Sequence, residues 1–94
     1  PRDVFESGLE YVESGEECDR NALPEWFVKY GYERVAVVSE PGDFSSRGSI
    51  VDFFPPGSQM PVRLDFFDDI VEEIRLFDPI TQRSVRKIDS KVIV

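Results

Sequence analysis

The segment Pro61–Phe67, with the sequence PVRLDFF, alternates between apolar and charged side chains along most of its length. In a β-strand, successive side chains point to opposite faces of the sheet. One set is Val62, Leu64 and Phe66, and the other set is Arg63, Asp65 and Phe67. The segment therefore predicts a strand that buries the first set and carries a cation, an anion and an aromatic ring on its outer face.

A second alternating segment, Val71–Phe77 with the sequence VEEIRLF, follows after a short connection. A two-residue turn at 68–69 would place Leu64 opposite Glu73 and bring a carboxylate to the apolar face. One extra residue in the connection, or a β-bulge, would place Leu64 opposite Ile74 instead. Because the buried pattern sets the register of a strand pair, the second pairing is favoured. It adds three residues to the outer face, namely Val71, Glu73 and Arg75.

Residues 20–30 carry the apolar spacing of one helix face. The apolar residues are Leu23, Trp26, Phe27 and Tyr30. Asp19 or Asn21 would cap the start of this helix by accepting a bond from an unpaired backbone N–H. Pro24 would lie near the first turn, where its missing N–H costs least, and Gly31 would end the helix.

The remaining apolar and β-branched segments predict further strands. These are a short edge strand within residues 5–13, strands at 34–39 and 49–54, and a last strand at 84–88 or 91–94. Several antiparallel strands with one helix predict an α+β domain, in which the helix at about residues 20–30 covers one face of an antiparallel sheet. The length of 94 residues suits a single domain spanning 1–94. Because the chain opens on Pro1 rather than Met, we interpret it as a domain excised from a larger multidomain protein.

Composition limits the partners of the domain. The 19 acidic residues outnumber the 11 basic ones and give a net charge of −8, which repels phosphate backbones and argues against direct nucleic-acid binding. No apolar run approaches the roughly 20 residues that cross a bilayer, and no signal segment opens the chain, so no membrane association is expected. Cys18 is the one cysteine, which fits a reducing cytoplasm rather than a disulfide framework.

Residues that support catalysis are scarce. The chain has no histidine, so it offers no imidazole base and no histidine ligand for a metal. It has no GxxxxGK[ST] loop to hold a phosphate. The acidic pairs 68–69 and 72–73 do not converge on one substrate, because adjacent strand residues point to opposite faces. We expect no enzymatic activity in this domain, no cofactor and no metal ion.

The outer face of the Pro61–Phe67 strand allows two interpretations. Arg63 and Asp65 are typical of a solvated strand surface, where a cross-strand pair such as Asp65–Arg75 contributes at most about 1 kcal/mol. Phe67 could also be buried at the end of the hairpin. Alternatively, an arginine beside an aromatic side chain is the combination enriched in binding hot spots.

Several short motifs, in their order and spacing, resemble a known family. They are Tyr32-Glu33-Arg34-Val35, Glu40-Pro41-Gly42-Asp43-Phe44, Arg47-Gly48, Asp52-Phe53-Phe54-Pro55, Gly57-Ser58, Pro61, Arg63-Leu64-Asp65-Phe66-Phe67, Ile74-Arg75, Phe77-Asp78 and Thr81-Gln82-Arg83-Ser84. Over about residues 5–94 the chain resembles the second domain of the UvrB-homology module in bacterial transcription-repair coupling factors. The excinuclease subunit UvrB shares the Tyr-Glu-Arg, Arg-Gly and Phe-Phe elements, and domain 2 of UvrB is the alternative assignment.

The resemblance implies a protein-docking domain that recruits UvrA in nucleotide excision repair. It implies that the docking residues are Arg47, Arg63 and Phe67, with Asp65 and Arg34 as helpers. It also implies that the C-terminal domain of the full-length factor covers this surface until activation, and that ATP-dependent DNA translocation belongs to other domains. We expect the isolated domain to be a monomer.

The chain departs from the family pattern at three positions. Ser45 stands where UvrB has a further arginine, Ile70 where the family usually has an acidic residue, and Asp68 where glycine is common. The last two lie at the tip of the predicted hairpin.

Two other functions remain as alternatives. A nucleic-acid-binding module would use the basic residues of the C-terminal part, which are Arg83, Arg86, Lys87 and Lys91. A structural spacer would bind no partner.

Overall fold

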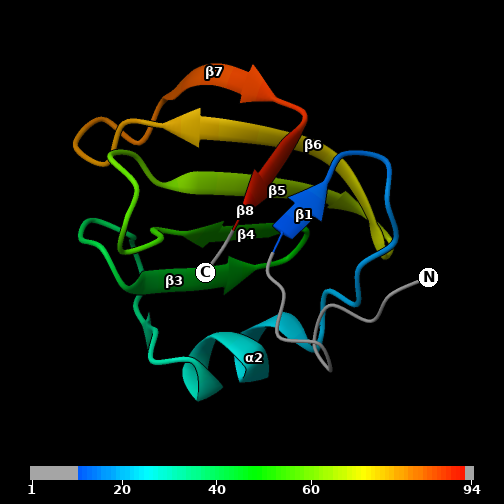
Figure 1. Ribbon diagram of the computed structural model, residues 1–94, viewed down its shortest axis with the longest axis horizontal. Coiled ribbons are helices and arrows are strands. Elements are labelled where there is room, and N and C mark those ends of the chain that lie inside the picture. The colour runs from blue at the N-terminus through cyan, green and yellow to red at the C-terminus, as the bar shows by residue number, and fades with distance from the viewer. Residues whose placement is uncertain (1–10, 93–94) are drawn as a thin grey trace.

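The computed structural model describes residues 11–92, apart from the side chains of residues 11 and 90–92. Six strands form the main sheet, in the order β2-β3-β4-β5-β6-β7 (Figure 1). Their bounds are β2 (Glu33–Arg34), β3 (Asp43–Arg47), β4 (Ile50–Phe53), β5 (Val62–Phe67), β6 (Ile70–Phe77) and β7 (Ser84–Ile88). With one short helix within the described residues, α2 (Leu23–Lys29), they confirm the α+β class. The sheet is mixed rather than antiparallel throughout, because β2 runs parallel to β3.

A two-stranded ribbon joins the two ends of the described chain. In it β1 (Tyr11–Glu13) pairs antiparallel with β8 (Ser90–Val92). The early strand predicted within residues 5–13 is thus confirmed for residues 11–13, and residues 5–10 lie outside the described residues. Both alternatives for the last strand form, as β7 and β8, while residues 93–94 lie outside the description.

The main core lies between one face of the sheet, the helix and the ribbon. From the strands it takes Phe44, Val51, Phe53, Val62, Leu64, Phe66, Val71 and Ile74, and from the other segments Val12, Leu23, Trp26, Phe27 and Tyr32. The three alternate residues of β5 that were predicted to be buried belong to it. This burial turns the other side chains of β5 to the opposite, outer face.

Helix α2 covers the core face only near the edge of the sheet formed by β2 and β3, and not across its full width. It lies beside β2 and β3 in Figure 1 and contacts those strands. Phe27 is fully buried, and its ring centroid lies 4.8 Å from Tyr32, 5.0 Å from Phe44 and 5.1 Å from Phe53. Stacked and tilted aromatic contacts of this kind add to the free energy gained by burial.

The start of the helix differs from the prediction. Ala22 is the N-cap and makes no side-chain cap bond, so the capping role predicted for Asp19 or Asn21 is wrong. Both residues are still outside the helix: the Asp19 carboxylate accepts a bond from the backbone N–H of Asn21 at 3.0 Å. Pro24 lies in the first turn as predicted. Gly31 follows the helix with a φ of 93°, which favours glycine.

The strand predicted at residues 34–39 is wrong for most of its length. Only Glu33 and Arg34 pair with β3, and the chain then leaves the sheet. Val38 turns inward to form a second apolar cluster with Phe54 and Phe77, packed against Val35. The run of valines therefore forms a loop here rather than a strand, in which Val38 is fully buried while Val37 is exposed.

Strand β3 has almost no apolar alternation, and its sequence, DFSSR, predicted no strand. Its position is set by its neighbours: Phe44 pairs with Phe53 of β4, and Arg47 pairs with Ile50. The turn between them contains Gly48, with a φ of 55°.

The register favoured for the long hairpin is confirmed, because Leu64 pairs with Ile74. The connection has two residues, and the extra residue is a β-bulge at Glu72. At the tip, Asp68 has a φ of 54°, in a region that Asp tolerates better than most side chains.

The bulge also corrects one part of the prediction. Phe66 pairs with Val71, so Val71 is fully buried on the core face and its predicted outer position is wrong. Glu73 pairs with Asp65 on the outer face, as predicted. Because the register changes at the bulge, only the residues between the bulge and the hairpin tip lie on a different face from the one predicted.

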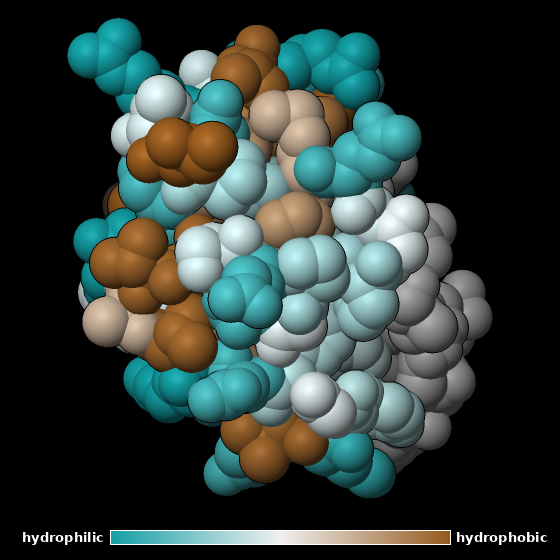
Figure 2. Space-filling view, turned by 90° about the vertical axis from the view of Figure 1, so that its left-hand side faces the viewer, coloured by the Kyte–Doolittle hydropathy of each residue, from teal (hydrophilic) through white to brown (hydrophobic). Residues whose placement is uncertain are grey.

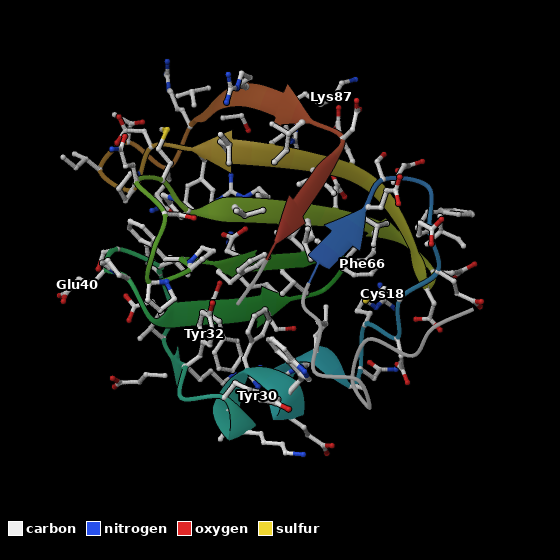
Figure 3. The ribbon with its side chains drawn as sticks, viewed as in Figure 1. Cys18, Tyr30, Tyr32, Glu40, Phe66 and Lys87 are labelled. Atoms are coloured by element: carbon white, nitrogen blue, oxygen red, sulfur yellow. The ribbon has the colours of Figure 1, made fainter. Side chains whose placement is uncertain are left out.

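Cys18 is half-buried against the core, and Figure 3 shows it near Phe66 and the β1 ribbon. The pKa of Cys18 is raised to about 11, mainly by burial and also by the nearby charges of Asp19 and Asp69. We expect iodoacetamide to alkylate native Cys18 slowly at neutral pH and faster as the pH approaches 11, because the thiolate is the nucleophile. Alkylation in the native state as fast as in urea would contradict this burial.

The raised pKa of Cys18 also determines how the stability of the fold depends on pH in the alkaline range. The folded state favours the protonated thiol. The stabilisation that this preference gives is therefore complete below the ordinary pKa of 9.0, and it declines as the pH rises toward about 11.

Candidate functional site

The outer face of the sheet carries a row of charged side chains across β3, β4, β5 and β6. Strand register places together Arg47, Asp52, Arg63, Asp65, Glu73 and Arg75. Four of the five residues predicted to form the site belong to this face or its end, namely Arg47, Arg63, Asp65 and Phe67.

Asp52 lies at the centre of this row, and sequence reasoning did not single it out. It is directly opposite Arg63, and its side chain is only 1% exposed. The guanidinium of Arg63 holds its carboxylate through two parallel bonds, from Nε at 2.8 Å and from Nη2 at 2.9 Å. A bidentate, charge-assisted pair of this kind is short and fixed in direction.

The side chain of Arg63 is mostly buried, with 12% of its surface exposed. Its guanidinium lies 4.3 Å from the centroid of the Phe77 ring. Its Nη1 donates to the backbone oxygen of Gln82 at 3.2 Å. The bond to Asp52 raises the pKa of Arg63, so the arginine keeps its charge.

Arg47 also approaches Asp52 but stays open to solvent. Its Nη2 lies 3.7 Å from an Asp52 oxygen, and its side chain is 60% exposed. One buried carboxylate thus faces two arginines, and the accessible positive charge is on Arg47.

The other charges of the outer face are paired with one another. Arg75 bonds Asp65 at 3.2 Å and lies 3.6 Å from Glu73. Glu73 in turn lies 3.4 Å from Lys87. Figure 3 shows Lys87 at the β7 edge of the sheet. The predicted pairing of Asp65 with Arg75 is confirmed. Ion pairs at the protein surface contribute only about 0–1 kcal/mol each.

Phe67 is 66% exposed at the end of β5, opposite Ile70. The turn after Arg47 reaches the same end of the sheet, because the N–H of Phe66 donates to the oxygen of Ser49 at 2.8 Å. Register then places Ile50 between Arg47 and Asp65. We call this surface the hairpin-end patch, and its residues are Arg47, Ile50, Asp65, Phe67 and Ile70.

Arg34 lies elsewhere. It pairs with Phe44, a core-face residue, and its guanidinium is 5.8 Å from the centroid of the Phe44 ring. It borders an open groove along α2 with Pro24 and Val28. The fold therefore brings the four other predicted residues together and leaves Arg34 on the helix side.

The opposite end of the sheet is formed by loops. Figure 2 views this end, where apolar side chains appear in several separate groups among hydrophilic ones. Ile80 is 90% exposed in its loop, and Val37 is exposed in a second loop. The basic residues Arg83 and Arg86 are exposed next to this end, in or beside β7.

Two further features are absent from residues 11–92. No group of three or more ligating side chains that could hold a metal ion occurs there. No helix in that range is long and apolar enough to cross a membrane.

Comparison with known proteins identifies the family. The family model described as "UvrB interaction domain" matches residues 11–94. The chain belongs to the UvrB interaction domain family. Interaction is the role that this family description names.

Relatives of this UvrB interaction domain occur in two kinds of repair protein. The transcription-repair-coupling factors of Bacillus subtilis and Escherichia coli are 39% and 38% identical over 90 and 79 residues, 96% and 84% of this chain. The UvrABC system protein B of Kosmotoga olearia is 34% identical over 93 residues, 99% of this chain. The chain spans only 8%, 7% and 14% of the length of these three relatives.

Proposed function

We propose that this domain is a docking module that recruits UvrA, and that it belongs to a transcription-repair-coupling factor acting in nucleotide excision repair. The observation that carries the proposal is the hairpin-end patch, where an exposed phenylalanine and an exposed arginine lie on the same face and at the same end of the sheet. The family description and the names of the relatives support a role as an interaction domain in repair.

Phe67 acts in this proposal as the apolar anchor. Its ring is 66% exposed, and Ile50 and Ile70 flank it on the same face. An exposed aromatic ring at the centre of a small apolar patch is typical of a hot spot that fills a partner pocket. The neighbouring turns are short and hydrogen-bonded, so little ordering entropy is lost on binding.

Arg47 and Arg63 act as the charged contacts. Arg47 presents its guanidinium to solvent and can form a charge-assisted bond with a carboxylate of UvrA. Arg63 directs four hydrogen bonds to Asp52 and Gln82, which leaves one of the five N–H donors of a guanidinium for a partner. Asp65 assists by holding Arg75, and Arg34 lies outside the docking face.

The test is a titration of purified UvrA with the wild-type domain and two arginine variants. Arg47→Ala should weaken binding by roughly 2–5 kcal/mol, the usual loss for a desolvated charged contact. Arg34→Ala removes the same charge from the helix side and should leave the affinity within about twofold. Equal losses in both variants would mean that net charge, and not the patch, governs binding.

The alternative function is nucleic-acid binding. It would use the basic residues Arg83, Arg86, Lys87 and Lys91. A net charge of −8 opposes it, and Lys87 is already near Glu73. Salt-dependent binding of duplex DNA by the isolated domain would support this rival. A spacer with no partner would give no UvrA signal at all. In the full-length factor, the proposal includes masking of the same patch by the C-terminal domain.

A further inference from the structure

Asp52 is the centre of a buried network that the docking residues share. We infer that Asp52 and Gln82 are positioning residues, which fix the two docking arginines without touching the partner. This inference rests on the proposed function and adds to it the groups that set the geometry of the site. Neither residue was a candidate from the sequence.

The position of Asp52 allows no direct contact with a partner. Its side chain is 1% exposed, and both of its carboxylate oxygens face arginines. Oδ1 accepts from Nε of Arg63 at 2.8 Å, and Oδ2 accepts from Nη2 at 2.9 Å while facing Arg47 at 3.7 Å. The same carboxylate therefore fixes the plane of the Arg63 guanidinium and attracts the guanidinium of Arg47.

Gln82 supports Arg63 from the opposite side. Its backbone oxygen accepts from Nη1 of Arg63 at 3.2 Å, and its Oε1 lies 3.5 Å from Nη2. Its Nε2 donates to the backbone oxygens of Val38 at 3.0 Å and Pro79 at 2.9 Å. The side-chain amide thus ties two loops and the arginine together.

The backbone of Gln82 adopts an uncommon conformation where it contacts Arg63. Its φ is 64°, a region that non-glycine residues seldom adopt. The turn before it is closed by a bond from the N–H of Gln82 to the oxygen of Asp78 at 2.7 Å. The carboxylate of Asp78 accepts a further bond from the N–H of Ile80 at 2.8 Å. Such conformations persist only where the surrounding bonds determine them.

If net charge governs binding, Asp52→Asn should change the affinity in one direction, and if Asp52 positions the arginines, it should change the affinity in the other. The substitution removes the one negative charge among Asp52, Arg47 and Arg63, so an acidic partner surface would be attracted more strongly if net charge governed binding. Positioning predicts the reverse. The neutral amide cannot accept both bonds from Arg63, and Arg47 loses its charged neighbour. The sign of the change in affinity separates the two accounts.

The experiment is a titration of UvrA with the wild-type domain, Asp52→Asn and Gln82→Ala. We expect Asp52→Asn to raise the Kd at least about tenfold, within the range of coupling in charged networks. Gln82→Ala keeps the backbone acceptor and should raise the Kd by a smaller factor, about threefold. An unchanged or lower Kd for Asp52→Asn, in a domain whose circular dichroism spectrum is native, would overturn the inference.

A double-mutant cycle adds a readout that a purely structural role would not change. If Asp52 acts through Arg47, the loss caused by Asp52→Asn should shrink when Arg47→Ala is already present. Additive losses would overturn the role of Asp52 in positioning Arg47. If Asp52→Asn does not fold, the cycle is run with Gln82→Ala and Arg63→Lys, and additive losses would again overturn the inference.

Failure of the inference is distinct from failure of the proposed function. If wild-type domain does not bind UvrA, the proposed function is wrong and the inference falls with it. If wild type binds and Arg47→Ala weakens binding while Asp52→Asn does not, only the inference is wrong.

Discussion

Replacing Phe67 with alanine is expected to weaken UvrA binding by about 2–4 kcal/mol, the usual loss at an aromatic hot spot. The ring is 66% exposed in the free domain, so its removal takes little from the core. The free energy of unfolding should change by no more than about 0.5 kcal/mol, as for other surface substitutions. Isothermal titration with UvrA and urea unfolding measure the two quantities.

Ile80→Ala is the matched control for this prediction. Ile80 is 90% exposed and lies in the loop between β6 and β7, at the end of the sheet opposite the β5–β6 turn. It is as apolar as Phe67 but lies outside the hairpin-end patch, so its removal should leave the affinity unchanged. A loss of affinity in Ile80→Ala equal to that in Phe67→Ala would place the partner at the loop end.

Replacing Phe27 with alanine is expected to destabilise the fold by about 3–5 kcal/mol, the usual loss for a buried phenylalanine. Phe27 is fully buried, and its ring contacts Phe44 and Phe53. The cavity would lie where the helix meets the sheet, and the surrounding rings cannot close it without leaving their stacked positions. Urea unfolding followed by circular dichroism measures the loss.

Val28→Ala in the same helix is the control for Phe27→Ala. Val28 is exposed, so its truncation removes little buried area. We expect a change within about 0.5 kcal/mol. A similar loss in both variants would mean that helix formation, rather than burial of the ring, limits stability.

The alternation in β5 was sufficient to predict the core and outer faces of the long hairpin. Burial of Leu64 opposite Ile74 requires one register of the strand pair, and the apolar pattern of the two strands is sufficient to predict that register. The exact place of the bulge, at Glu72, was not predictable because Glu72 and Glu73 are the same residue type. Val71 was misplaced for this reason.

The segments that were wrongly predicted are those whose structure depends on distant partners. Residues 34–39 have strand-like composition, but Val38 packs on Phe54 and Phe77 from a loop. Strand β3 has little apolar content and forms because β4 and β2 lie on either side of it. Composition alone carries no information about those neighbours.

The candidate site was predictable in part. Alternation placed Arg63, Asp65 and Phe67 on one face, and the resemblance added Arg47. Asp52 had a signal that could have been read, since it is the charged residue between the buried Val51 and Phe53. Gln82 had none, because its role depends on a loop that closes over the sheet.

The most direct test of the account is nuclear magnetic resonance mapping of the labelled domain during titration with UvrA. We predict that the largest amide perturbations occur at Arg47, Ile50, Asp65, Phe67 and Ile70, with small ones along α2. Perturbations centred on the groove beside Arg34, or on the basic edge at β7, would contradict the proposed docking surface.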